Sequence, residues 1–384
     1  MIFSPDEVIN HRKPVTENPA RRLCTLVVTH QCNLQCVYCY ESYKSYKSMP
    51  VDIAKDIITS EFDFVAKSSQ FKEISIDFIG GEPLLKFDLI KEIAEWIWSA
   101  PRPVPYILFS TTNGTLLDGA MKEWFRHHKK RFYLSLSFDG TSEMHRINRG
   151  ECLDDIDLDF FYENWPDQPL KMTISPETVD SLCQGIIFLQ EKGFRVGASL
   201  GYGMPWNEKS VAEYGKQLQI LGEYYLEHKN IQPVSLLDLP LQYTLEKPSP
   251  AQSKFCGAGT HMAAYDVDGT AYPCHMFTPL VLKSDKSDIH VLQFIENEQY
   301  SDLRCRGCVL EKICPTCYGM NYKQRGDIAL RDEMVCRLFK EQVLANCWFK
   351  TQLLKRKKMN ENLSVEDIRL AKSCLFLLKE FNFQ

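Results

Sequence analysis

Long apolar runs are absent from this chain of 384 residues, and no segment approaches the roughly 18 residues that span a bilayer. The opening segment Met1–Asn10 carries acidic residues and lacks the apolar stretch of an export signal. Basic residues are not in excess, and the net charge of −5 leaves no electrostatic footprint for nucleic acid. Internal repeats and low-complexity segments are also missing. These absences predict a chain that neither enters a membrane nor binds nucleic acid.

Cysteine, in contrast, is plentiful, with fifteen residues in the chain. Without an export signal, so many cysteines argue against a disulfide framework and for metal ligation in a reducing compartment. We therefore expect a cytoplasmic protein. The length suffices for one large domain and a smaller one, each with its own core.

Three of the cysteines, Cys32, Cys36 and Cys39, have the spacing C-x3-C-x2-C directly after an apolar run that is typical of a buried strand. Three thiolates this close can hold three irons of a [4Fe–4S] cube and leave the fourth iron without a protein ligand. A structural zinc site requires four ligands, and this segment supplies three. An open iron is a place where a substrate binds and receives one electron.

This spacing, with the aromatic Tyr38 just before the third cysteine, resembles the radical S-adenosylmethionine (radical SAM) family. The resemblance implies that Cys32, Cys36 and Cys39 hold the catalytic cluster and that SAM chelates its open iron. Electron transfer then breaks the S–C5′ bond of SAM and yields a 5′-deoxyadenosyl radical, which abstracts a substrate hydrogen. The protein orients the cofactor and excludes competing reactions.

Periodicity predicts alternating strands and helices, and therefore an α/β fold with a parallel sheet. The predicted strands are 22–29, 73–79, 106–112, 133–138, 170–174 and 196–200. The predicted helices are 51–67, 88–100, 118–128 and 178–192. Six such strands match the partial (β/α)6 TIM-type barrel that the resemblance implies. Sites in parallel barrels lie at the carboxyl ends of the strands, where the Cys32–Cys39 loop also falls.

The domain prediction follows from composition and these elements. We expect an N-terminal arm, a radical SAM partial barrel, a small cysteine-rich domain, and a C-terminal helical tail whose basic run is solvated. Their predicted bounds are 1–21, 22–235, 236–340 and 341–384. Residues 230–253 are rich in proline and are expected to link the two domains. The acidic, aromatic segment 146–168 interrupts the pattern, and we interpret it as a solvated excursion in preference to a lid.

Two short motifs end predicted strands. Gly80, Gly81 and Glu82 form a GGEP turn, where glycine lets the backbone approach a ligand closely. They resemble the family motif that contacts the amino group of SAM. Thr112 and Asn113 begin a T-N-G turn that resembles a second pocket-lining motif, although a plain strand-end turn would look the same.

A third motif, around Ser137, resembles the family's S-x-D-G strand end. By resemblance, Ser137 hydrogen-bonds the ribose, and Arg149 pairs with the SAM carboxylate, which suits a bidentate guanidinium. His145 and Arg149 stand where the family carries H-D-x-x-R. This chain has Arg146 in place of the usual Asp, a departure within that motif.

Seven further cysteines resemble the SPASM extension, which carries auxiliary [4Fe–4S] clusters behind radical SAM barrels. They are Cys256, Cys274, Cys305, Cys308, Cys314, Cys317 and Cys336. The last pair departs from the family, because two residues separate its cysteines where three are typical. A structural zinc module is the competing interpretation, but zinc ribbons separate their C-x2-C pairs by about 15–20 residues, against five here.

The resemblance divides these cysteines into two ligand sets, so that three [4Fe–4S] clusters are expected in all. One auxiliary cluster would use Cys305, Cys308, Cys314 and Cys336. The other would use Cys256, Cys274 and Cys317, with only three cysteines. Either His261 completes this second set or one of its irons is open, and both alternatives stand at this point. The remaining five cysteines are expected to be buried apolar residues.

The SPASM resemblance predicts a maturase that installs an oxidative crosslink, a carbon–carbon cyclophane or a thioether, in a ribosomally made precursor peptide. Maturation of a folded protein, of the sulfatase formylglycine or quinohemoprotein type, is the alternative enzyme. Sulfatase maturases typically have Asp after the second SPASM cysteine, where this chain has His275, which can itself accept a proton as a catalytic base. An iron–sulfur electron-transfer protein is the alternative without catalysis.

The expected partners are the precursor peptide and a flavodoxin- or ferredoxin-type electron donor. About 20 residues precede the first predicted strand, too few for a leader-binding domain. We therefore expect the leader to dock on the barrel or SPASM surface, or to be bound by a separate protein.

Overall fold

The computed structural model describes residues 21–245, 256–283, 302–360 and 362–382. Two compact units divide the chain. The first comprises residues 1–138, 149–170 and 254–296, and the second comprises 139–148, 171–253 and 297–384. The predicted N-terminal arm, except for Arg21, lies outside the described residues, as do the end of the predicted link, 246–253, and residues 284–301 of the expected cysteine-rich domain.

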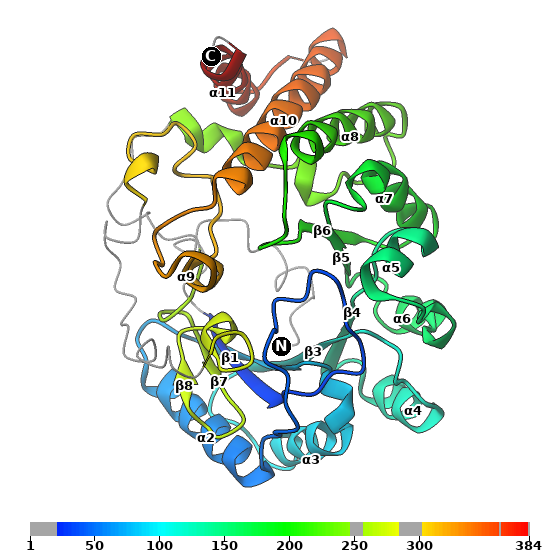
Figure 1. Ribbon diagram of the computed structural model, residues 1–384, viewed down its shortest axis with the longest axis vertical. Coiled ribbons are helices and arrows are strands. Elements are labelled where there is room, and N and C mark those ends of the chain that lie inside the picture. Colours follow the sequence, from blue (N-terminus) through cyan, green and yellow to red (C-terminus); the bar gives the residue numbers. More distant parts are fainter. Residues whose placement is uncertain (1–20, 246–255, 284–301, 361, 383–384) are drawn as a thin grey trace. The chain divides into compact units, whose positions relative to one another are not determined.

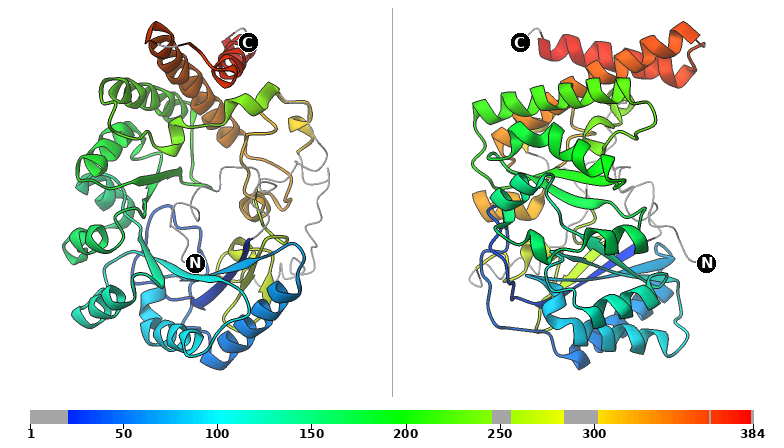
Figure 2. Two further views of the ribbon diagram at one scale, coloured as in Figure 1. Left: turned by 180° about the vertical axis from the view of Figure 1, so that it is seen from behind. Right: turned by 90° about the vertical axis from the view of Figure 1, so that its right-hand side faces the viewer.

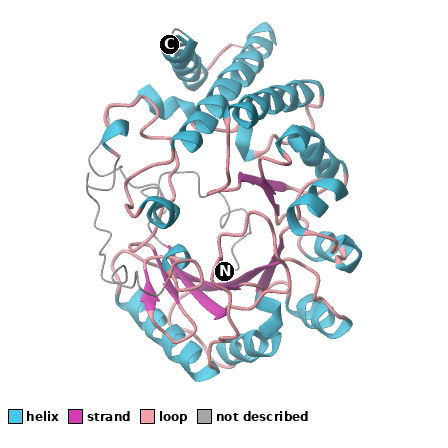
Figure 3. Ribbon diagram, in the orientation of Figure 1, coloured by secondary structure: helices cyan, strands magenta, loops and turns pink. Residues whose placement is uncertain are grey.

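The first unit is built on a six-stranded sheet with the order β4-β3-β2-β1-β7-β8 (Figures 1 and 3). Neighbouring strands run parallel from β4 through to β7, and β8 pairs antiparallel with β7. The strands are β1 (Arg21–Thr29), β2 (Glu73–Gly80), β3 (Tyr106–Thr112), β4 (Phe132–Leu136), β7 (Met262–Tyr265) and β8 (Ala271–Tyr272). The carboxyl ends of β1, β2 and β3 therefore meet at one edge, as the sequence predicts.

The helices of this unit lie against the sheet (Figure 2). They are α2 (Val51–Lys67), α3 (Phe87–Trp98), α4 (Gly119–His128) and α6 (Leu158–Asn164), and α2 and α3 each bury a row of apolar side chains. In α2 the buried side chains recur at spacings of three and four, and include Ile58, Phe62 and Val65. The α2 helix contacts β1, β2 and α3. Asp118 caps the amino end of α4, since its side chain accepts a hydrogen bond from the Met121 amide.

The segment 146–168 differs from the expected solvated excursion. It contains α6, whose residues Phe160 and Phe161 are buried and stack edge-on against each other. Trp165 packs against both rings and against Phe125 of α4. Its indole also donates a hydrogen bond to the carbonyl oxygen of Lys129. The burial of these aromatic rings therefore holds the segment against α4, in spite of its acidic residues.

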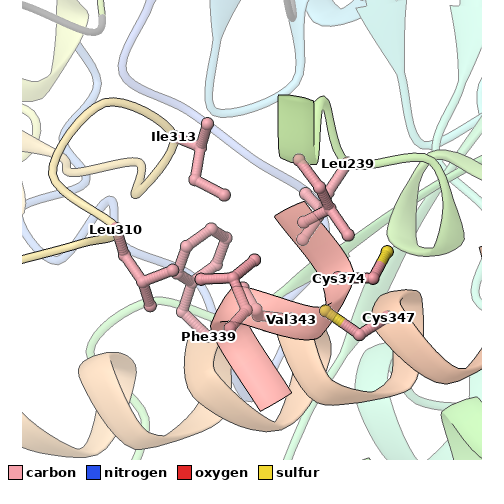
Figure 4. Packing of buried hydrophobic residues seen from close by; sticks show 9 residues of the cluster. Leu239, Leu310, Ile313, Phe339, Val343, Cys347 and Cys374 are labelled. Carbon is pink, nitrogen blue, oxygen red and sulfur yellow. The ribbon is translucent and has the colours of Figure 1, made fainter. Parts of the chain in front are cut away.

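The second unit holds the strand pair β5 (Leu170–Ile174, whose first residue belongs to the first unit) and β6 (Val196–Leu200). Its helices are α5 (Ser142–Arg149, whose last residue belongs to the first unit), α7 (Leu182–Glu191), α8 (Glu208–Glu227), α9 (Tyr318–Arg325), α10 (Glu333–Asn360) and α11 (Val365–Asn382). The α10 helix packs along α8 and α11. A buried apolar cluster joins α10 and α11 to residues 239–241 and 310–313, and Figure 4 labels Leu239, Leu310, Phe339 and Val343 among its members. Leu377 of α11 also belongs to the cluster.

All six predicted strands are present, so the α/β prediction is confirmed, with a mostly parallel central sheet. Two features differ from the predicted bounds. Residues 262–265, expected in a separate cysteine-rich domain, pair with β1 as strand β7. The expected tail belongs to the core of the second unit. Within the described residues, no helix is both long enough and apolar enough to cross a bilayer.

Candidate functional site

The loop after β1 carries Cys32, Cys36 and Cys39 at the carboxyl edge of the sheet, and all three side chains are partly exposed. The Cys39 amide donates to the Cys36 carbonyl over 3.1 Å, which forms a turn between the two cysteines. Lys44 reaches back to the Leu34 carbonyl over 3.0 Å. Desolvation raises the pKa of Cys32, so its thiolate is disfavoured until a metal ion binds the sulfur.

Gly80 and Gly81 allow the turn after β2 to lie directly against this loop. A Cβ atom on Gly80 would overlap the carbonyl oxygen of Thr29, and one on Gly81 would overlap that of Gln31 and lie 2.8 Å from the Cβ atom of Cys32. The Gly81 amide donates to Thr29 over 3.1 Å. Both positions therefore require glycine because of close backbone approach.

Glu82 is a buried carboxylate that ties the ends of β2 and β3 together. Its Oε1 atom accepts from the Thr112 hydroxyl at 2.7 Å and from the Leu84 amide at 3.0 Å. Its Oε2 atom accepts from the Asn113 amide at 2.8 Å. Desolvation raises the pKa of Glu82, although these hydrogen bonds and the positive charge of Arg149 oppose the rise. Glu82 thus ties the turn after β2 to the end of β3.

Asn113 connects the T-N-G turn to the cysteine loop. Its Nδ2 donates to Oδ1 of Asn33 over 2.9 Å, and Asn33 in turn donates to the Thr115 hydroxyl over 2.8 Å. Gly114 has φ +83°, and a Cβ atom there would lie 2.6 Å from Leu136. The predicted motif residues Gly81, Glu82 and Asn113 and the loop of three cysteines are therefore brought together.

Arg149 and Ser137 lie in the same unit. The Arg149 guanidinium is buried and stands over the ring of Tyr38, 5.4 Å from its centroid. The Ser137 amide donates to the Thr112 carbonyl over 2.9 Å, and its side chain is partly exposed. Arg146, the departure from the family motif, pairs on the surface with Glu143 at 2.5 Å.

His275 and His261 occupy different surroundings. His275 is partly exposed, and its ring lies 5.7 Å from that of Tyr40, the residue after Cys39. The Tyr43 amide donates to the Leu280 carbonyl over 3.1 Å, so residues 275–280 flank the cysteine loop. The His261 ring lies 3.4 Å from the Gln70 amide and 3.2 Å from the Thr260 hydroxyl, near the amino end of β1.

Four of the second-unit cysteines lie close to one another. Desolvation raises the pKa of the Cys314 thiol to about 12, opposed by the positive charge of Arg331, and the neighbouring thiols of Cys336, Cys305 and Cys308 add to the rise. The Cys308 amide donates to the Cys305 carbonyl over 3.0 Å, as in a tight C-x2-C turn. This grouping contains the members of the predicted four-cysteine ligand set.

The other predicted set has members in both units, with Cys256 and Cys274 in the first and Cys317 in the second. It stays a prediction. None of the fifteen cysteines, all of which are described, forms a disulfide. Across the described part of the chain, no three His, Cys, Asp or Glu side chains surround one point as a single metal ion requires.

Sequence reasoning missed a buried pair at the base of the cysteine loop. His30 Nε2 lies 2.7 Å from Oδ1 of Asp266, and its Nδ1 lies 3.0 Å from the Ser45 hydroxyl. Asp266 directly follows β7, so this pair fastens the start of the loop to the added strand. The partners are separated by 236 residues, and no local pattern connects them.

Comparison with known proteins identifies the family. The model of the Radical SAM superfamily matches residues 26–218, half of the chain. The chain belongs to the radical SAM superfamily. This is a superfamily of enzymes, and the matched region contains the cysteine loop and the motifs at the ends of β2 and β3.

Relatives of this radical SAM protein include two curated enzymes. It is 23% identical to the radical SAM cyclopropyl synthase TigE of Paramaledivibacter caminithermalis, over 82% of this chain and 71% of TigE. It is 23% identical to a cysteine-type anaerobic sulfatase-maturating enzyme of Clostridium perfringens, over 81% of this chain and 92% of that enzyme. An uncharacterized protein of Methanocaldococcus jannaschii is 42% identical over 71 residues, which span 23% of its length.

Solved structures share the fold. The structure of anSMEcpe with bound AdoMet matches 92% of this chain and 99% of its own, with a TM-score of 0.64 and 18% identity. The structure of Streptococcus suis SuiB bound to the precursor peptide SuiA matches 87% of this chain and 82% of its own, with a TM-score of 0.54 and 16% identity. The predicted resemblance to SPASM-type radical SAM proteins is thereby confirmed at the level of fold.

Proposed function

We propose that this radical SAM protein is a peptide maturase that cleaves SAM reductively and installs an oxidative crosslink in a ribosomally synthesised precursor peptide. The observation that carries the proposal is the contact of three motifs at one sheet edge. There Gly81 lies against Cys32, and the Asn113 side chain donates to Asn33 of the cysteine loop. A protein that only carries electrons would need neither the glycine turn after β2 nor the T-N-G turn after β3.

The residues at this edge fit a cluster and a bound nucleotide. Cys32, Cys36 and Cys39 would hold the [4Fe–4S] cluster, and Tyr38, Gly80, Gly81, Glu82, Thr112, Asn113, Ser137 and Arg149 would line the SAM pocket. The glycine turn fits because it leaves backbone exposed where any side chain would collide with the loop. When bound, the cluster and SAM supply hydrogen abstraction by a 5′-deoxyadenosyl radical.

Side chains of the protein itself would orient SAM and deprotonate the substrate. Arg149, held over Tyr38, offers a fixed fork to the carboxylate of SAM. Glu82 keeps the ends of β2 and β3 in register through three accepted hydrogen bonds. His275, whose ring lies beside that of Tyr40, would take the proton that leaves the substrate when the crosslink closes. Crosslinking removes two hydrogens, one as an atom and one as a proton with an electron.

Two auxiliary [4Fe–4S] clusters are part of the proposal, because that surplus electron needs an acceptor. Cys305, Cys308, Cys314 and Cys336 would hold one, and the neighbouring thiols around Cys314 support this set. Cys256, Cys274 and Cys317 would hold the other. The two nitrogen contacts of His261, to Gln70 and Thr260, favour an open iron over a histidine ligand there.

The known relatives support a polypeptide substrate. TigE is named a cyclopropyl synthase, and SuiB has been solved with its precursor peptide SuiA. We propose a precursor peptide as the substrate, a flavodoxin- or ferredoxin-type electron donor, and leader recognition by the protein surface or by a separate protein. We also propose a reducing, cytoplasmic setting, which agrees with the absence of disulfides among the fifteen cysteines.

Maturation of a folded protein is the second candidate. It is favoured by the sulfatase-maturating relatives in both sequence and structure. His275 stands where that branch typically has Asp, so the sulfatase reaction would need histidine as its base.

The first test is SAM cleavage by the anaerobically reconstituted protein with a chemical reductant. Parent protein is expected to release 5′-deoxyadenosine, and the Cys32→Ala, Cys36→Ala, Cys39→Ala triple variant is not. Cys183→Ala, which removes a buried cysteine outside every ligand set, serves as the control. Equal cleavage by the triple variant and the parent would refute the proposal.

The second test identifies the product by mass spectrometry of a co-expressed precursor peptide encoded beside this protein. Loss of two hydrogens supports crosslinking. An unchanged mass would indicate epimerisation, and conversion of a Ser or Cys side chain to an aldehyde would favour the sulfatase-type reaction.

A further inference from the structure

Arg331 of the second unit points its guanidinium at a cysteine of the four-cysteine set. Its Nη1 donates to Sγ of Cys314 over 3.1 Å and to the Cys314 carbonyl oxygen over 3.4 Å. Its Nε atom is buried and has no hydrogen-bond partner within the described residues. A buried N–H without an acceptor costs about 1–3 kcal/mol, so the arrangement is incomplete as it stands.

The backbone of Arg331 is fixed from the other side. Oδ2 of Asp302 accepts the Arg331 amide at 2.9 Å, and Nη2 of Arg304 donates to the Arg331 carbonyl over 2.8 Å. Asp302 and Arg304 also pair with each other at 2.6 Å. Asp302 is buried and lies three residues before Cys305. This clamp holds the Arg331 segment against the Cys305 segment, so the side chain is directed at Cys314 by main-chain bonds.

The charge on Arg331 needs an anion close by. No carboxylate forms a salt bridge with its guanidinium among the described residues. The Arg331 side chain is half-buried and its Nε atom is fully buried, and a cation withdrawn from water in this way is costly without an anion close by. The surroundings therefore suit Arg331 when the cysteines are thiolates, as they are when they ligate iron.

We propose that Arg331 is a positioning residue for the auxiliary iron–sulfur centre of Cys305, Cys308, Cys314 and Cys336, and that it raises the reduction potential of this centre. This rests on the proposed function, which assigns the four cysteines to that centre. Hydrogen bonds to the sulfurs and nearby positive charge stabilise the added electron, and both raise the potential of an iron–sulfur cluster. Arg331 would thereby make this centre the better acceptor of the electron released by crosslinking.

The test is a redox titration followed by electron paramagnetic resonance. The Cys32→Ala, Cys36→Ala, Cys39→Ala background removes the signal of the catalytic cluster from the reconstituted protein. In this background, Arg331→Gln is expected to lower the midpoint potential of one auxiliary centre. We expect at least a tenfold fall in its reduced-to-oxidised ratio at a fixed potential, about 59 mV for a one-electron couple. Arg306→Gln is the matched control.

Arg306 carries the same charge one residue after Cys305, but it is exposed to solvent. Its replacement is expected to leave the potential unchanged, because water screens its charge. A titration of Arg331→Gln that overlays the parent's, with parental iron content, would overturn the proposal. If this variant fails to bind iron, Arg331→Met is titrated instead, because it removes both the charge and the hydrogen bond and keeps an unbranched side chain. A potential below the parent's supports the proposal, and an unchanged one overturns it.

A separate variant distinguishes failure of this inference from failure of the cluster assignment. Cys305→Ala, Cys314→Ala is expected to lose about four irons per chain. Undiminished iron in that double variant would refute the assignment of the four cysteines, and with it the role of Arg331. Loss of iron there, together with a parental titration of Arg331→Gln, would refute the role of Arg331 alone.

Discussion

At the scale of single residues, Glu82 links the end of β2 to the end of β3 by hydrogen bonds. Its two carboxylate oxygens accept three hydrogen bonds in a buried site. A glutamine there has the same shape but only one acceptor oxygen, so its NH2 group must face a donor. The sequence motif indicates a functional turn, and the structure adds how the turn is fixed.

Glu82→Gln is therefore expected to destabilise the reconstituted protein by about 1–3 kcal/mol, because at least one buried donor loses its acceptor. The check is the thermal unfolding midpoint. Glu92→Gln makes the same replacement in an exposed ion pair with Lys55, where the cost is about 0–1 kcal/mol. Equal midpoints for the two variants would contradict this role of Glu82.

Gly81 provides a second test at this scale. In Gly81→Ala the new methyl group collides with the backbone of Gln31, and backbone atoms cannot rotate away. The cysteine loop must therefore shift, and we expect the variant to bind less iron and to unfold at a lower temperature. Gly119→Ala is the control, since nothing lies within 4 Å of its added methyl group at the start of α4. Parental iron content and SAM cleavage in the Gly81→Ala variant would exclude this close packing.

The same scale shows what the sequence can and cannot predict. Gly81, Glu82 and Asn113 are accessible to sequence reasoning because each ends a strand, and parallel strands bring their ends together. The pair of His30 and Asp266 is not accessible to sequence reasoning, because the two residues are 236 positions apart in the chain. Arg331 escapes prediction for a related reason, since its contact with Cys314 spans 17 positions, which include helix α9, and no local pattern connects the two residues.

At the scale of elements, strong hydrophobic periodicity predicts the helices and strands correctly, whereas the acidic composition around α6 predicts the wrong environment. The bounds of α2 and β3 agree with the predicted ranges residue for residue. The acidic residues around α6 outnumber the aromatic ones and favour a solvated excursion, yet Phe160 and Phe161 are buried. Strand β7 escapes prediction because four residues, Met262–Tyr265, carry too little period, and their place is decided by the free edge of β1.

The α11 helix tests whether the carboxyl-terminal region contributes to stability. Leu377 is fully buried in the cluster of the second unit, whereas Leu375 on the same helix is 61% exposed. Leu377→Ala is expected to cost about 2–5 kcal/mol through lost burial and an unfilled cavity. Leu375→Ala makes the same change in helix propensity and should cost less than about 0.5 kcal/mol. The measurement is the unfolding midpoint of each variant, and similar midpoints would mean that α11 is dispensable for the core.

At the scale of the whole molecule, the chain is divided by contacts and not by sequence order. Residues 254–296 return to the first unit after a long passage through the second. Single-sequence reasoning assigns domains as continuous ranges, so it places this segment in the cysteine-rich domain. The cysteine pattern is still informative in part, because spacing within one short segment survives any arrangement of the rest. The segment that contains Cys305, Cys308 and Cys314 is an example, because these three cysteines lie within ten residues of one another in the chain.

Iron content per chain tests the remaining set, which combines residues of both units. Parent protein is expected to bind about twelve irons, four for each of three cubes. Cys256→Ala, Cys274→Ala should lower this by about four, because a cube that keeps one cysteine of three loses its anchorage. Cys183→Ala and Cys347→Ala together remove two buried cysteines outside all the ligand sets and should leave the iron count unchanged. Parental iron in the Cys256, Cys274 variant would reduce the protein to two clusters, and the surplus electron would then have only the centre beside Arg331 as its acceptor.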